Sequence, residues 1–161
     1  MSSSIVTALL WTAALSSGLI AGVYFAFSAF IMQAFEKIDT TQSIAAMKSI
    51  NQTILRSLFM PLFFGSSLIS VCLIIAAFAQ WGEDDAELIL IAGSVYFIGM
   101  FVCTVFFNVP LNNSLERLDP NSTNAHQLWC RYQKTWTSWN HLRTVSSFVT
   151  CILCIWLLSN H

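Results

Sequence analysis

The sequence predicts an all-α membrane protein, a four-helix bundle that forms one domain over residues 1–161. The chain is 56% hydrophobic and 9% charged, with a mean hydropathy of +0.67, whereas soluble domains are about 25% charged. Four apolar stretches are long enough to cross a bilayer, and no Pro/Gly/Ser-rich linker divides them. A net charge of -1 and dispersed basic residues argue against nucleic acid as a partner.

The first predicted span covers residues 5–35, which contain no charged residue. This stretch is longer than the ~20 residues that cross a ~30 Å hydrocarbon core, so we expect it to tilt or protrude. It lacks the basic start of a cleaved signal peptide. Ala14, Gly18, Gly22 and Ala26 recur every fourth residue and favour close helix packing. Packing within the bundle is the simpler interpretation, and a homo-oligomer through the Gly18/Gly22 face is the alternative.

A second helix is predicted to begin after Asp39, which forms a capping-box pattern with Gln42. If it continued to residue 80 it would measure about 60 Å, twice the hydrocarbon thickness. Its first part should therefore stand outside the lipid, and residues 57–80 should form the span. Pro61 is predicted to kink the helix near the membrane entry.

The third and fourth spans follow an acidic turn at residues 81–87. Residues 88–109 form the third apolar span, and a loop at about 118–124 separates it from the last helix. The last helix should cover residues 125–159, of which only 137–159 are needed to cross the bilayer.

The basic residues predict the orientation of the bundle. Of the seven Lys and Arg, three lie between the first two spans, four lie between the end of the third span and residue 143, and none lies at the termini. The positive-inside rule then puts both termini outside, in a plasma membrane or bacterial inner membrane. The extended parts of the second and fourth helices would be cytoplasmic and pack as a cap.

The strongest functional signal lies in residues 129–143, where polar and aromatic side chains lead into the last span. At about 100° per residue, one stripe of this helix collects five residues, with His141 about a third of a turn aside. These residues are Trp129, Gln133, Trp136, Asn140 and Arg143. Counting about 20 residues inward from the outer ends of the last two spans reaches Phe107 and Asn140. Asn108 and Asn112 are therefore expected to face Asn140 and Arg143 across a pocket that opens toward the cytoplasm.

Each of these residues also has an ordinary explanation. Trp136 can anchor the helix at the membrane interface, Arg143 can be an orientation signal that reaches toward water, and Asn112 can cap a helix. Asn108 and Asn140 are harder to explain in this way, because carboxamides near lipid need hydrogen-bond partners.

The five cysteines are an odd number inside or beside apolar runs, so we expect reduced thiols: Cys72, Cys103, Cys130, Cys151 and Cys154. The spacing of Cys151 and Cys154 resembles a quinone-linked thiol oxidoreductase, although buried free cysteines commonly serve as packing residues.

No metal site is expected, because the three histidines have no carboxylate or second histidine at ligand spacing: His126, His141 and His161. The sequence leaves open the alternative that one of these histidines is an axial haem ligand.

Four segments give the chain a resemblance to the anthrone oxygenase-like family of small four-span membrane proteins. They read AGVYFAFSAFIM, AAMKSINQTI, FNVPLNNSL and W-x-x-Y-x-x-x-W-x-x-WNHLRT. The resemblance implies oxygenation of a flat aromatic substrate. An anthrone has an acidic ring methylene, and its enolate can react with dioxygen without a cofactor.

In this interpretation His141 is the base, and Asn140 and Arg143 stabilise the oxyanion. The expected substrate-binding residues, of which the tryptophans would stack on a flat ring, are Asn51, Asn108, Asn112, Trp129 and Trp136. The alternative is a non-enzymatic accessory protein that binds a lipid or another apolar ligand at the same place.

Overall fold

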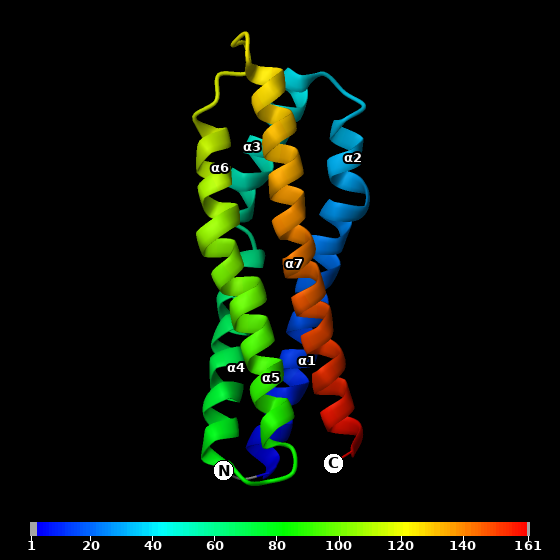
Figure 1. The fold of residues 1–161 in the computed structure, drawn as a ribbon, viewed down its shortest axis with the longest axis vertical. Coiled ribbons are helices and arrows are strands. Elements are labelled where there is room, and N and C mark those ends of the chain that lie inside the picture. The colour runs from blue at the N-terminus through cyan, green and yellow to red at the C-terminus, as the bar shows by residue number, and fades with distance from the viewer. Residues whose placement is uncertain (1–2, 161) are drawn as a thin grey trace.

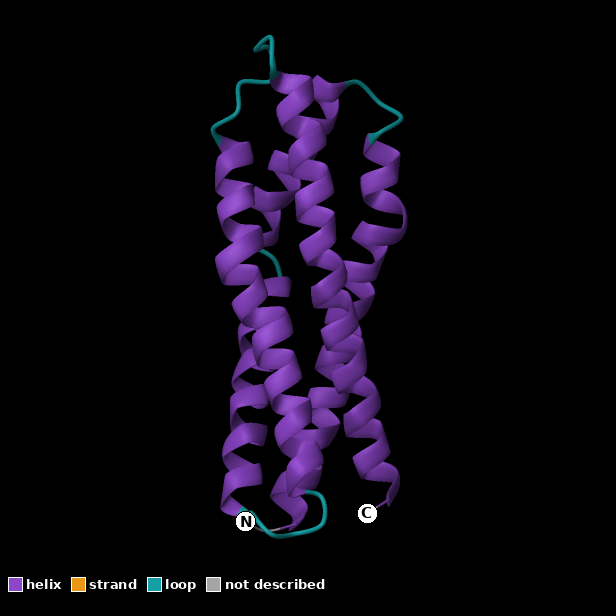
Figure 2. Ribbon diagram, viewed as in Figure 1, coloured by secondary structure: helices purple, strands orange, loops and turns teal. Residues whose placement is uncertain are grey.

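The computed structural model describes residues 3–160, and the chain over this range is helical, with no β-strand (Figures 1 and 2). Four helical rods are long and apolar enough to cross a membrane: Ser4–Phe35, Phe59–Ala79, Ala86–Glu116 and Ala125–Asn160. The predicted number of spans is therefore confirmed. Both ends of the described chain lie at the same end of the bundle, beside the turn that joins the second and third rods (Figure 1).

Two of the rods change helix type along their length. The elements in chain order are α1 (Ser3–Ala26), η1 (Phe27–Ile31), α2 (Met32–Phe35), α3 (Thr40–Ile54), α4 (Phe59–Ala79), α5 (Ala86–Tyr96), η2 (Phe97–Val102), η3 (Thr104–Asn108), α6 (Val109–Glu116) and α7 (Ala125–Asn160), where η marks a π-helix. A π-helical turn inserts an extra residue, so it rotates every later side chain around the helix axis.

The second predicted helix is two helices, so the expectation of one rod from residue 40 to residue 80 was wrong. α3 ends at Ile54 and α4 begins at Phe59. The Ser57 hydroxyl donates to the Ile54 carbonyl at 2.8 Å and accepts from the Phe59 N–H at 3.2 Å, which closes the turn between them. Pro61 lies in the first turn of α4, where a missing N–H has little cost, so it helps to begin a helix instead of kinking one.

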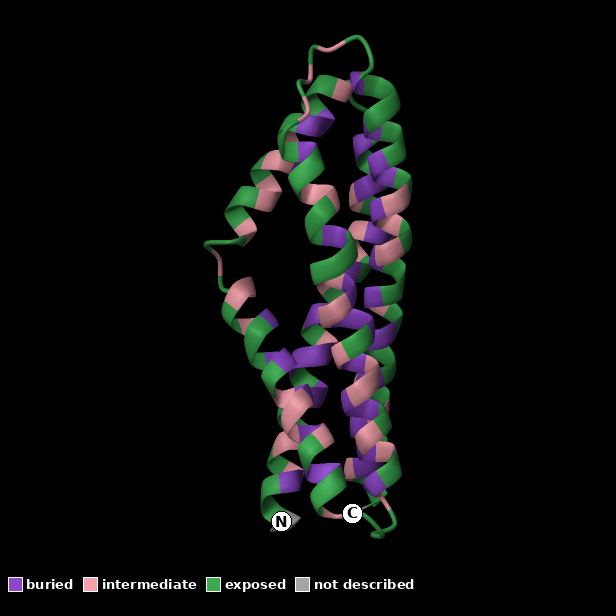
Figure 3. Cartoon of the chain, turned by 60° about the vertical axis from the view of Figure 1, so that its left-hand side comes forward, coloured by how far each residue is buried: buried purple, intermediate pink, exposed green. Residues whose placement is uncertain are grey.

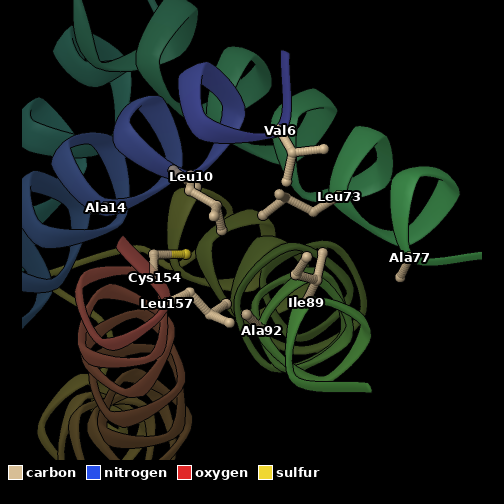
Figure 4. Close-up of a cluster of buried hydrophobic side chains, with 10 residues drawn as sticks. Val6, Leu10, Ala14, Leu73, Ala77, Ile89, Ala92, Cys154 and Leu157 are labelled. Carbon is tan, nitrogen blue, oxygen red and sulfur yellow. The ribbon is translucent and has the colours of Figure 1, made fainter. Parts of the chain in front are cut away.

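The outer half of the bundle, near the termini, packs α1, α4, α5 and α7 around an apolar core (Figure 4). Small residues allow the helices to approach closely. A Cβ added to Gly93 would lie 2.7 Å from the Ser70 carbonyl oxygen, and one added to Gly18 would lie 3.3 Å from Cys151 Sγ. α7 of the same chain therefore packs against Gly18, whereas Gly22 has open space beside it. The predicted homo-oligomer stays a prediction.

The other end is a separate cap, formed by α2, α3, α6 and the first half of α7 around a second apolar core. The Lys48 ammonium group holds α3 to the end of α6 by donating to the Glu116 and Leu118 carbonyls, both at 2.8 Å. Asp39 begins α3, but its side chain makes no capping bond, contrary to the predicted capping box. Instead, the Ser43 hydroxyl donates to the Phe35 carbonyl at 2.7 Å.

α3 and α4 bow away from the other helices where they meet, between the outer core and the cap (Figure 3). This is the level at which η1, η3 and the middle of α7 lie.

Candidate functional site

The predicted stripe on α7 is the buried face of that helix. Trp129, Gln133, Trp136, Asn140 and Arg143 are all buried, and Asn140 has no exposed surface. Because this helix also carries polar residues at the depth of the membrane, each buried polar group needs a partner.

Asn140 joins α7 to the first rod and fixes the position of an arginine. Its Nδ2 donates to the Tyr24 carbonyl at 2.7 Å and to the Ser28 hydroxyl at 2.5 Å. Its Oδ1 accepts from Nη2 of Arg143 at 2.6 Å. Ser28 lies in η1, and Tyr24 lies in the last turn of α1 just before it. The amide is thus a positioning group for the Arg143 guanidinium.

Arg143 is buried without an acidic partner. Its Nη1 contacts the Thr104 hydroxyl at 3.4 Å, and its guanidinium carbon lies 4.1 Å from the centre of the Tyr24 ring and 5.0 Å from that of Trp136. Its Nε has no hydrogen-bond partner. Within residues 3–160 no carboxylate forms a salt bridge with it. Two aromatic faces therefore supply only part of the stabilisation that a buried cation needs.

Arg143 forms one wall of a cavity of about 210 Å³ between α3, α4, η3 and α7. Most of the lining is apolar or aromatic, including Phe59 and Phe63 from α4. Asn51 of α3 also lines the cavity, and its Nδ2 is a second buried donor without a partner. An apolar cavity with a few polar groups aimed inward is the usual form of a small-molecule site.

Asn112 lines the same cavity and orients its aromatic wall. Its Oδ1 accepts from Trp136 Nε1 at 2.9 Å and from the Tyr132 hydroxyl at 3.0 Å. Both acceptor lone pairs of this oxygen are then used, so the indole ring of Trp136 is held against the cavity.

Asn108 and Trp129, which we also expected at the site, do not line the cavity. Asn108 is buried between the third and fourth rods, where its Nδ2 donates to the Trp136 carbonyl at 3.4 Å. Trp129 packs in the cap with Phe35 and Tyr132, at ring-centre distances of 6.1 and 5.5 Å. The structure therefore brings Asn51, Asn112, Trp136 and Arg143 together and places Asn108 and Trp129 in neighbouring packing.

His141 is exposed and points away from Arg143. It lines a different hollow, of about 550 Å³, together with Glu36 of the first rod and Lys134 of α7. A base at this position would act on a ligand in that hollow and not on one beside Arg143.

The other two histidines are remote from the cavity or outside the described chain. His126 Nδ1 lies 2.9 Å from the Thr40 hydroxyl in the cap, and His161 lies outside the described residues. Over residues 3–160 no three of the His, Cys, Asp and Glu side chains gather in a way that could hold a metal ion.

The thiols of the last helix pack against their neighbours. Cys151 lies against Gly18, and Cys154 is fully buried in the outer core (Figure 4). All five cysteines are free.

The sequence analysis missed Tyr24 and Thr104, which contact the guanidinium from the first and third rods. One signal was available for Tyr24, because it lies about 20 residues from the outer end of its span, at about the level of Arg143. Thr104 gave no such signal, because its direction depends on η2, the π-helical stretch before it.

Taken together, these features define a small integral membrane protein with four spans and a cavity that is lined by aromatic side chains and one arginine. Residues 55–153 match the family model of anthrone oxygenases, which is more than half of the chain. The chain therefore belongs to the anthrone oxygenase family. No curated protein and no protein of solved structure matches it.

Proposed function

We propose that the protein binds a flat aromatic substrate with an acidic ring methylene in the Arg143 cavity and oxidises it with dioxygen, without a cofactor. The observation that carries this proposal is the buried guanidinium with no carboxylate partner. A buried cation without a counter-ion is costly, and an oxyanion formed on the substrate would supply the missing negative charge beside Arg143.

The cavity suits such a substrate in its shape and chemistry. Phe59, Phe63 and Trp136 supply aromatic surface, on which a fused ring system can pack in stacked or edge arrangements. Arg143 and Asn51 supply two unused donors from different walls. A ring system with one oxygen beside each of these donors would accept a hydrogen bond from both.

The proposed reaction balances with dioxygen as the oxidant. Loss of one proton from the ring methylene gives an enolate, whose oxygen lies against Arg143. The carbanionic carbon is oxidised by dioxygen, forms a C–O bond and gives a peroxide, which takes a proton. Loss of the remaining C–H hydrogen and cleavage of the O–O bond release water and leave a ketone. Overall, one substrate and one O₂ give one quinone and one H₂O.

Arg143 would accelerate this reaction by stabilising the enolate as charge develops, in a cavity lined mostly by apolar side chains. The proton needs a temporary acceptor beside the cavity. Among the described residues that line the cavity there is no His, Asp or Glu, and His141 lines another hollow, so we assign this role to hydroxide from solvent, which becomes water.

The test of the proposal compares Arg143→Gln with Arg131→Gln, which removes an exposed arginine from the same helix. Purified protein in lipid discs is mixed with 1,8-dihydroxyanthracen-9-one, and oxygen consumption and quinone absorbance are followed. We expect Arg143→Gln to lower the rate by about 10² to 10³-fold, as removal of one oxyanion donor does, and Arg131→Gln to leave it unchanged. Equal rates in both variants would refute the proposal. Binding by the wild type without oxygen consumption would favour a non-enzymatic ligand-binding protein.

We also propose that the cap is cytoplasmic and that both termini are outside. The support is the distribution of basic residues: three lie between the first two spans, Arg117 lies in the loop before α7, three lie in α7, and none lies at the termini or in the turn at 81–87. Asp85→Cys should react with an impermeant thiol reagent on intact cells lacking the native cysteines, and Asn121→Cys should not. The opposite labelling pattern would place the termini in the cytoplasm and the cap outside.

A further inference from the structure

We infer that the ligand of the Arg143 cavity enters sideways from the bilayer, between the α3–α4 turn and η3, and is therefore a compound that partitions into the membrane. This inference rests on the proposed binding function, because it concerns the same cavity. It differs from the opening toward the cytoplasm that the sequence suggested.

The outward-facing part of the cavity lining is entirely apolar. Its exposed residues are Leu55 beside the α3–α4 turn, Phe64 of α4, and Val105 and Val109 of the third rod. We call these four residues the portal. They lie where α3 and α4 bow away from the other rods (Figure 3).

The polar residues of the cavity lie behind the portal. Asn51, Thr104, Asn112 and Arg143 are buried or half-buried, and Arg143 is the one charged residue among those that line the cavity. A cleft that opens to water has the opposite arrangement, with a polar rim and an apolar interior. An apolar rim over a polar interior suits entry from hydrocarbon, where exposed polar groups would be costly.

The depth of two portal residues agrees with this route, whereas Val109, 23 residues from the outer end of α5, lies about 34 Å from it, at the level of the headgroups. Phe64 lies 15 residues from the outer end of α4, and Val105 lies 19 residues from the outer end of α5. At 1.5 Å per residue these positions are about 22 and 28 Å from the outer boundary, inside a hydrocarbon layer of ~30 Å. Phe64 and Val105 are thus exposed to acyl chains, not to water.

On the cytoplasmic side the cap covers the cavity. Met47, Ile50 and Ile54 of α3 form this wall, and Met47 is almost completely buried. Entry from the cytoplasm would require α3 to leave the cap, where Lys48 holds it to α6. Entry through the portal requires only movements of exposed side chains.

The test narrows the portal without touching the polar interior. Val105→Phe/Val109→Phe adds two rings at the portal, and Val145→Phe/Val149→Phe adds the same rings to exposed valines of α7 that do not line the cavity. Each protein is placed in phosphatidylcholine discs under argon with 1,8-dihydroxyanthracen-9-one. Binding and release are followed by stopped-flow quenching of tryptophan fluorescence.

We expect the portal variant to slow association and dissociation together by about tenfold, because both directions then need a conformational change. The dissociation constant should stay within about twofold, since the interior contacts are intact. The α7 variant should match the wild type. Phe64→Ala, which widens the portal, should speed both rates.

Unchanged rates in both the narrowed and the widened portal would overturn lateral entry, as would equal slowing in the α7 variant. Because oxygen is absent, these rates test the route even if the protein proves unable to oxidise the probe. A wild type that binds no probe and retains one phospholipid per chain by mass spectrometry would refute both the route and the proposed function, and would assign the cavity to a bilayer lipid.

Discussion

Replacing Arg143 with methionine should abolish ligand binding and leave the stability of the ligand-free protein nearly unchanged. This outcome separates a binding arginine from a structural one. The guanidinium is buried, and its hydrogen bonds go to Asn140 and Thr104 without a carboxylate. Methionine has a similar length and fills the same space, so the change removes the charge with little loss of packing.

The opposing contributions to the free energy of unfolding can be estimated from these contacts. Replacing a buried ionic group by an apolar one of similar volume is neutral or stabilises by about 1 to 4 kcal/mol. Loss of the cation–π contacts with Tyr24 and Trp136 costs about 1 to 2 kcal/mol, and leaving Asn140 Oδ1 without its donor costs about 1 to 3 kcal/mol. At the middle of these ranges the losses exceed the gain slightly, so we expect a net loss of about 1 to 2 kcal/mol.

The assay is thermal unfolding of Arg143→Met in lipid discs, with and without 1,8-dihydroxyanthracen-9-one. Without the probe, the unfolding temperature should change little. With a saturating probe, the wild type should be stabilised, since ligand that binds only the folded state raises stability by mass action. Arg143→Met should show no such shift, and the exposed Arg131→Met should behave as the wild type does.

A loss of more than about 3 kcal/mol in the absence of probe would refute the reasoning, because such a loss follows the breaking of a buried charge pair. Arg143 would then be structural, and an anionic partner for it would have to exist in the folded protein.

Two further predictions concern packing in the outer half of the bundle. Gly93→Ala should lower the free energy of unfolding by about 1 to 3 kcal/mol, because the added Cβ would lie 2.7 Å from a backbone oxygen of α4. Gly65 has open space beside it, so Gly65→Ala should be neutral or stabilise by up to about 1 kcal/mol. Both variants are measured by chemical denaturation, and equal losses would contradict the close approach of α4 and α5 at Gly93. Replacing Cys151 and Cys154 together with alanine should leave oxygen consumption intact after correction for folded protein. Loss of activity with intact folding would instead support the thiol oxidoreductase interpretation.

The four spans were predictable from the sequence, because crossing a bilayer requires about 20 apolar residues and a fully bonded backbone. The same reasoning located the extensions of the second and fourth predicted helices. It also identified the buried stripe of α7, because that helix is an uninterrupted α-helix in which 100° per residue holds throughout.

The break between α3 and α4 was not predictable in the same way. The sequence around Ser57 allows a continuous helix, and the only visible breaker, Pro61, belongs to the first turn of α4. The turn forms because α3 packs in the cap whereas α4 packs along α5, and the two partners require different directions. Competition between two packing surfaces is a property of the folded chain.

The composition of the site was decided by tertiary structure. Periodicity gives the direction of a side chain only relative to its own helix, and the rotation of each helix against its neighbours follows from packing. The π-helical turns change the rotation of the side chains along these rods relative to an ideal α-helix: Ser28, in η1, meets Asn140, and Thr104, which follows η2, meets Arg143. The sequence alone placed an arginine at this depth, and the packing of the rods decided that it is buried and which groups surround it.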